Sequence, residues 1–146
     1  MEKRIIGPNT IDLDAMIERG TQMHGHLGPF LVAGFRMGLL ALELLGSTGY
    51  FGINAESDTG SVTPLSCLSD SIQIGSGCTV GKGNLTIKDV YVPRARFFIE
   101  GGKGVEITLR PEIVEGFRSG ELTAECERIK TRPLEELFTW KNLPSS

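Results

Sequence analysis

Hydrophobic residues recur every three or four positions in two segments near the start of the chain. This spacing predicts one helix over residues 11–23 and a second over residues 29–45. The second segment is apolar nearly all round, so we expect a central helix that is covered on several sides. Gly34 and Gly38 lie about one turn apart on it, which would let another backbone approach closely.

The rest of the chain mixes two periods of hydrophobic residues. Alternation predicts strands over residues 50–57, 84–92, 95–100 and 105–109, the last two joined in a hairpin by a glycine turn. Helical spacing predicts helices over residues 65–76, 111–117, 121–130 and 133–138. This order of elements predicts an α+β layer fold.

The composition is typical of a globular protein with one domain, residues 1–146. With 40% hydrophobic and 23% charged residues, the chain can bury an ordinary core. Its net charge of −3 argues against a nucleic-acid binder, which would normally be basic. The long apolar run from Phe30 to Leu45 is interrupted by Arg36 and Glu43 and is too short to cross a bilayer comfortably. Since no signal peptide is recognisable either, we expect no membrane association and a cytoplasmic location.

Both histidines of the chain lie in one short segment, His24-Gly25-His26. The segment comes just before Pro29, a natural first residue for the second helix. One histidine could simply cap or pack while the other is solvated. Histidine is the commonest metal ligand, however, so two of them this close together favour a metal site.

Two of the three cysteines lie in a second unusual segment, residues 67–85, together with several glycines. The helix expected over 65–76 places Cys67 and Asp70 on one face. Cys78 comes eleven residues after Cys67, which is roughly 16 Å along a straight helix. The two thiols can therefore share a metal only if the helix breaks early or a second subunit intervenes.

The odd number of cysteines, without an export signal, indicates thiols or metal ligands rather than disulfides. Cys126 shares a helical face with Leu122 and Ile129 and is expected to be a core thiol. The Gly81-Lys82 pair does not form a nucleotide-binding loop. The motif requires another glycine and a hydroxyl residue at set positions, and a strand before the loop, and none of these is present.

Five segments of the chain follow the motif order of a known protein family. They are His24-Gly25-His26-Leu27-Gly28-Pro29 with Gly34-Phe35-Arg36, Cys67-x-x-Asp70-x-Ile72-Gln73, Gly77-Cys78-Thr79-x-Gly81-Lys82-Gly83-Asn84-Leu85, Gly102-Lys103-Gly104-Val105 and Pro133-Leu134-Glu135-Glu136-Leu137-Phe138. Together they resemble the E-subunit family of formylmethanofuran dehydrogenase over nearly the whole chain. The resemblance implies an α+β core with a mixed, about four-stranded sheet, usually as a homodimer. It also implies zinc or another transition metal near the His/Cys motifs, and a link to the molybdenum- or tungsten-dependent enzyme that makes formylmethanofuran in methanogens.

The chain departs from the family pattern in two respects. The first motif usually reads H-G-H-x-C-P-G, but here Gly28 stands at the cysteine position and Phe30 follows Pro29. One metal ligand of the family is therefore missing. Many members also carry a C-terminal treble-clef zinc finger, and the resemblance covers only the core domain without it.

The resemblance carries four candidate metal ligands over to this chain: His24, His26, Cys67 and Cys78. We expect His26 and Cys67, with His24 as a further member, to form a cluster within one subunit. Asp70 would lie next to these ligands without binding the metal itself, and would accept a hydrogen bond from one of them or act as a weak base. Three nitrogen and sulfur ligands with one open position are typical of a catalytic or substrate-binding zinc. Because Cys67 begins a helix, the helix dipole is expected to stabilise its thiolate.

Cys78 and Lys82 are expected to form a separate patch, or to join the site across a dimer interface. Cys78 could equally be a small packing residue in the core. If the protein is an enzyme, its candidate catalytic residues are Cys67, Asp70 and Lys82.

The sequence leaves three functions open. The first is a metal-binding subunit or accessory protein of formylmethanofuran dehydrogenase. The second is a stand-alone thiol or zinc-dependent enzyme that acts on a small anionic substrate. The third is a metal-free module whose glycine-rich loop holds a ligand.

Overall fold

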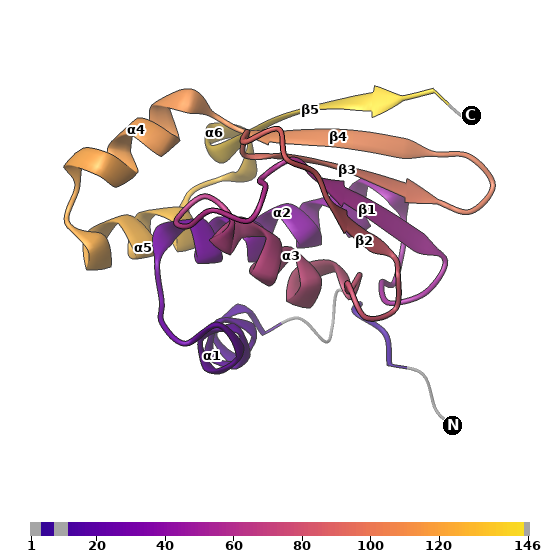
Figure 1. Cartoon of the computed structure of the whole chain (residues 1–146), viewed down its shortest axis with the longest axis horizontal. Coiled ribbons are helices and arrows are strands. Elements are labelled where there is room, and N and C mark those ends of the chain that lie inside the picture. Colours follow the sequence, from indigo (N-terminus) through magenta and orange to yellow (C-terminus); the bar gives the residue numbers. More distant parts are fainter. Residues whose placement is uncertain (1–3, 8–11, 145–146) are drawn as a thin grey trace.

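Figure 1 shows the computed structural model, in which a sheet lies over a layer of helices. The structure describes residues 4–7 and 12–144. Its elements are α1 (Leu13–His24), α2 (Pro29–Leu45), β1 (Ile53–Ser57), α3 (Cys67–Ser76), β2 (Leu85–Ile87), β3 (Arg94–Ile99), β4 (Gly104–Leu109), α4 (Pro111–Ser119), α5 (Leu122–Thr131), α6 (Leu134–Leu137) and β5 (Phe138–Leu143).

The sheet has five strands in the order β2-β1-β3-β4-β5. β1 runs parallel to β2, whereas the other neighbouring strands pair antiparallel. This arrangement confirms the α+β fold and its mixed sheet, with five strands instead of about four. β3 and β4 form the predicted hairpin. Buried residues alternate along the strands because one face of the sheet packs on the helices.

The additional strand is β5, which begins where the sequence predicted a helix over 133–138. The helix α6 ends at Leu137, and Phe138 opens the strand by pairing with Leu109. Phe138 is almost completely buried. Pairing along β4 therefore places this aromatic ring in the core, a tertiary effect that the local spacing of hydrophobic residues does not reveal.

Two strands are shorter than predicted because turns interrupt the backbone. β1 begins only at Ile53, since Tyr50 and Gly52 have φ angles of 69° and 72°, through which extended backbone cannot continue. β2 ends at Ile87, because a turn follows in which the Val90 N–H donates a hydrogen bond to the Lys88 carbonyl oxygen at 3.0 Å.

The helix α1 lies close to its predicted position. Asp12 caps it, and its carboxylate accepts a hydrogen bond from the backbone N–H of Ala15 at 3.1 Å. The predicted first residue, Ile11, lies outside the described residues. α1 continues to His24, one residue beyond the prediction.

The helix α2 is the central helix, as predicted, and most of its residues are buried. It packs against the sheet, α1 and α3. A Cβ atom added to Gly38 would lie 2.8 Å and 2.9 Å from backbone atoms of Gly75 and Ser76. The predicted close approach of another backbone is thus confirmed. Among the described helices, none is long and apolar enough to cross a membrane.

A buried carboxylate fixes the loop that follows β1. The Asp58 side chain is fully buried and accepts hydrogen bonds from Arg94 Nε at 2.6 Å and from Arg96 Nη1 and Nη2 at 2.8 Å and 2.6 Å. Burial alone would raise the pKa of Asp58. The hydrogen bonds from Arg96 and Arg94 outweigh burial, so this pKa lies below its ordinary value. We call these three residues the Asp58 clamp.

Replacing Gly38 by alanine should destabilise the protein by about 2 kcal/mol, because the added methyl group meets backbone atoms that cannot rotate away. This figure is a net value. Alanine favours the helix by about 1 kcal/mol over glycine, which offsets only part of the destabilisation caused by the steric overlap. Urea unfolding measures the change. Gly81→Ala is the control, because its Cβ would meet nothing within 4 Å. Equal stability of the two variants would contradict the close contact.

The Asp58 clamp should make the protein sensitive to acid. Because the pKa of Asp58 is depressed in the folded state, its contribution is complete above the ordinary aspartate pKa of about 4 and is lost as the pH falls through the lower folded value. We expect Asp58→Asn to cost about 3 kcal/mol at pH 7. Between about pH 5 and pH 2, which bracket this range, the free energy of unfolding should fall less for the variant than for the wild type. Parallel pH profiles of the two unfolding free energies would contradict the expectation.

Candidate metal centre

The structure brings together three of the four predicted metal ligands. His24 is the last residue of α1, His26 lies in the connection to α2, and Cys67 is the first residue of α3. The possible ligand atoms of these three residues all lie within 4.8 Å of one another. A cluster within one subunit was predicted, and the geometry is compatible with it.

A left-handed turn separates the two histidines. Gly25 has a φ of 103° and ends α1 with a hydrogen bond from its N–H to the Thr21 carbonyl oxygen. The chain then reverses toward α2, so that the rings of His24 and His26 lie 4.7 Å apart between centroids. His26 is exposed, whereas the His24 side chain is only 10% exposed.

The two ring nitrogens of His24 have different surroundings. Its Nδ1 lies 2.5 Å from Asp70 Oδ2, so the Nδ1–H donates a hydrogen bond to the carboxylate. Its Nε2 is buried and has no hydrogen-bond partner among the described residues. A buried acceptor without a partner costs about 1–3 kcal/mol, and a metal ion bound at Nε2 would remove that cost. This contact is compatible with the expected role of Asp70 behind a metal ligand, which stays a prediction.

The expected stabilisation of the Cys67 thiolate by the helix dipole is not observed. Cys67 is 5% exposed, and burial, followed by the negative charge of Asp70, raises the pKa of its thiol. Desolvation therefore outweighs the position at the start of α3. A metal ion would have to displace the thiol proton, so its affinity should fall as the pH falls.

The donor set fits a transition metal. Two imidazole nitrogens and one thiolate sulfur suit zinc better than hard cations, which prefer oxygen ligands. His24 and Cys67 are held from elements of the core, whereas His26 approaches from the solvent side. The structure thus offers three ligands.

Cys78 and Lys82 lie outside this group. Cys78 is completely buried, and its thiol donates a hydrogen bond to the Ile53 carbonyl oxygen at 3.7 Å. Lys82 Nζ donates to the Gly77 carbonyl oxygen at 2.6 Å and to Thr79 Oγ1 at 3.2 Å. The Cys78 contact joins the loop after α3 to the start of β1, whereas the Lys82 contacts hold that loop together. Cys126 is buried on α5, in agreement with the predicted core thiol.

The residues that support the start of α3 were not found from the sequence. The hydroxyl groups of Ser57, Thr59 and Ser69 are buried and form a chain, with 2.8 Å between Ser57 and Ser69 and 2.7 Å between Thr59 and Ser69. Ser57 and Thr59, the two ends of this chain, flank Asp58, so the Asp58 clamp holds both ends in place. The middle member, Ser69, lies in the first turn of α3, between Cys67 and Asp70. The only sequence signal was the polar run after the first strand.

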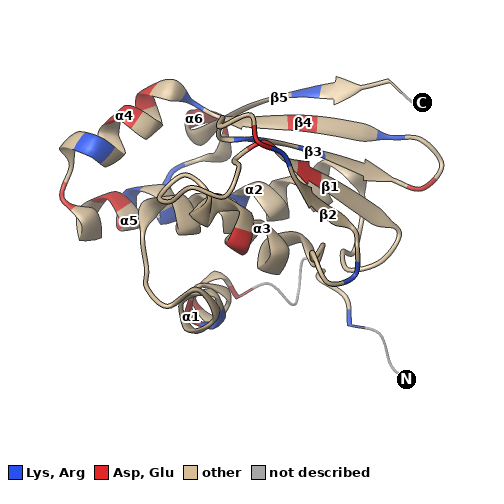
Figure 2. Cartoon of the chain, viewed as in Figure 1, with Lys and Arg blue, Asp and Glu red and all other residues tan. Residues whose placement is uncertain are grey.

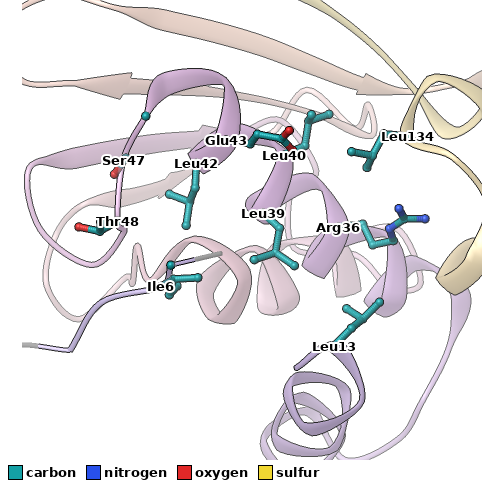
Figure 3. Close-up of a pocket in the computed structure, with 12 residues that line it drawn as sticks. Ile6, Leu13, Arg36, Leu39, Leu40, Leu42, Glu43, Ser47, Thr48 and Leu134 are labelled. Atoms are coloured by element: carbon teal, nitrogen blue, oxygen red, sulfur yellow. The ribbon is translucent and has the colours of Figure 1, made fainter. Parts of the chain in front are cut away.

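A cavity of about 700 Å³ lies elsewhere, between α1, α2 and α6 (Figure 3). Apolar side chains such as Leu13, Leu39 and Leu134 line it. Its charged neighbour Arg36 already donates to the carbonyl oxygens of Ile129 and Arg132. No histidine or cysteine lines this cavity among the described residues, so it is separate from the candidate metal centre.

Comparison with known proteins agrees with this architecture. Residues 23–144 match the family described as FmdE, molybdenum formylmethanofuran dehydrogenase operon. A protein of Archaeoglobus fulgidus named probable S-adenosyl-L-methionine-binding protein is 32% identical over 126 residues, which are 82% of this chain and 33% of the relative. This chain thus spans about a third of that relative.

A solved structure has the same fold. It is an FmdE-like protein from Syntrophus aciditrophicus, named after the E subunit of tungsten formylmethanofuran dehydrogenase, which superposes with a TM-score of 0.72 over 99% of this chain and 78% of that chain. At 18% identity, the likeness extends to the fold alone. The family match covers most of the sequence. The chain therefore belongs to the FmdE family of proteins related to formylmethanofuran dehydrogenase.

Proposed function

We propose that this protein is a metal-binding subunit or accessory protein of a molybdenum or tungsten formylmethanofuran dehydrogenase. The observation that carries the proposal is the buried Nε2 of His24, which has no partner among the described residues and lies in one group with His26 and Cys67. The family match supports the link to the dehydrogenase. Zinc is the metal that fits the two nitrogens and one sulfur best.

Each residue would have a distinct role in holding the metal. Asp70 keeps the proton of His24 on Nδ1 and so leaves Nε2 free to bind. Cys67 contributes the single negative charge of the donor set, and His26 closes the group from the solvent side. A zinc ion with three protein ligands supplies Lewis acidity and an exchangeable fourth position.

A stand-alone enzyme is the competing form of this proposal. Cys67 and Asp70 lie at the candidate metal centre and could both touch a substrate there. Lys82 donates hydrogen bonds to Gly77 and Thr79. These bonds favour a role in stabilising the loop after α3 over a catalytic role. Turnover by the purified chain would favour an enzyme, whereas co-purification with dehydrogenase subunits would favour a subunit. The homodimer suggested by the sequence can be tested by light scattering on the same sample.

The name of the Archaeoglobus fulgidus relative favours a second candidate, the binding of S-adenosyl-L-methionine. The cavity between α1, α2 and α6 is large enough for a small molecule. Calorimetric titration of the chain with S-adenosyl-L-methionine tests this candidate, with and without metal. Equal heat release with and without metal would support binding in this cavity, apart from the candidate metal centre. The metal-free module was expected to hold its ligand in the glycine-rich loop instead, and that loop does not line this cavity.

The ligand assignment predicts about one zinc ion per chain in protein purified without an affinity tag. Cys67→Ser and His24→Gln should each lose the metal, because each removes one of three ligands. Cys78→Ser should retain it, because the Cys78 thiol is bonded to Ile53 in the core. Elemental analysis of the four proteins decides the assignment. Metal-free wild type, or loss of zinc from Cys78→Ser, would overturn it.

The carboxylate of Asp70 should be needed for tight binding rather than for folding. Asp70→Asn keeps the shape of the side chain but weakens its acceptance of the His24 proton, and should lower zinc affinity about 10–100-fold. Competition with a chromophoric chelator measures the affinity. The urea midpoint of the metal-free variant should stay close to that of metal-free wild type. Unchanged zinc affinity would mean that Asp70 does not orient the ligand.

A further inference from the structure

Beside the candidate metal centre the chain leaves room for a side chain that it does not supply. Gly28 caps α2, two residues after His26, with φ −148° and ψ 166°. This is extended backbone that any residue adopts. A Cβ atom added to Gly28 would meet only one atom within 4 Å, the Nε2 of His26 at 3.8 Å. The free space therefore adjoins a ring nitrogen of His26, one of the three proposed ligands.

The two segments that carry the proposed ligands hold no unpaired charge. Residues 22–31 and 58–72, which carry the three ligands, contain no lysine or arginine. Figure 2 shows the connection between α1 and α2 free of charged residues. The two carboxylates in these segments are engaged, Asp70 with His24 and Asp58 with its arginine pair. A ligand with a second charged group would find no countercharge on these segments.

Exposed apolar side chains flank the two histidines. Met23 precedes His24 and is 49% exposed, and Leu27 follows His26 and is 39% exposed. Large apolar residues beside a functional site commonly contact the body of a ligand. The rim thus matches an uncharged, apolar ligand better than a multiply charged one.

The charge of the three proposed ligands indicates which donor atom an external ligand would offer to the metal. Two neutral imidazoles and the Cys67 thiolate leave one positive charge on a divalent ion. A single anionic donor would neutralise it, and a sulfur donor matches the preference of zinc in sites that already contain thiolate. A thiolate meets both conditions.

We propose that the space beside Gly28 admits the sulfur atom of an external thiol with an uncharged, largely apolar body. The proposal rests on the metal-binding function proposed above. When the thiol binds, its proton passes to the solvent, its sulfur takes the fourth position, and one water molecule is released. No electrons are transferred, so no oxidant or reductant is needed.

Cobalt(II) in place of zinc makes this binding visible, because a new cobalt–sulfur bond adds charge-transfer absorption. The cobalt-loaded protein is titrated with 1-propanethiol and with 3-mercaptopropionate, which differ mainly in a charged end group. We expect saturable absorption with 1-propanethiol at a concentration at least about tenfold lower than with 3-mercaptopropionate.

Three substitutions of Gly28 distinguish a side chain that only fills the space from one that binds the metal. Gly28→Ala should keep the thiol response, because its methyl group lies at ordinary contact distance from His26. Gly28→Val should bind cobalt but lose the response, because its branched side chain fills the space and cannot ligate. Gly28→Cys should show the additional absorption without any thiol and should bind the metal at least about tenfold more tightly.

The outcomes distinguish this inference from the proposed function. Wild type that binds no cobalt would overturn both. Cobalt binding without a thiol response, or an undiminished response in Gly28→Val, would overturn only the thiol site. An equal response to 3-mercaptopropionate would overturn the apolar thiol as the ligand class.

Discussion

The contact between α2 and α3 is the constraint on which the rest of the structure depends. The two helices approach so closely that glycine is required on both, at Gly38 on α2 and at Gly75 on α3. α2 begins just after the histidine segment, and α3 begins at Cys67. Fixing the two helices against each other therefore also fixes the distance between the histidines and the thiol. The packing of these two helices therefore sets the geometry of the candidate site.

The sheet also helps to position the candidate site, because it is bonded to the start of α3. The Asp58 clamp and the buried hydroxyl chain connect β1 and β3 with the first turn of α3. Buried polar groups are costly unless each one is paired, and these groups pair across three elements. The start of α3 is consequently held at two points, by α2 along its length and by the sheet at its first turn.

The sequence was most informative about features that depend only on residues close together in the chain. The apolar segment at 29–45 had to be a buried helix, and the rise of a helix was enough to predict that Cys67 and Cys78 lie apart. Long-range effects could not be predicted in the same way. β5 depends on pairing with β4, and the Asp58 clamp joins residues more than thirty positions apart. The pKa of Cys67 depends on its burial in the folded protein, which outweighs the local helix dipole that the sequence suggested.

The burial of Cys67 also bears on the chemical durability of the protein. Peroxides and disulfides react with exposed thiolates, and a buried thiol with a raised pKa offers little of this reactive form. The metal-free protein should therefore keep this sulfur reduced through periods of oxidative exposure. The same desolvation that makes Cys67 a weak acid would thus protect its sulfur from oxidation.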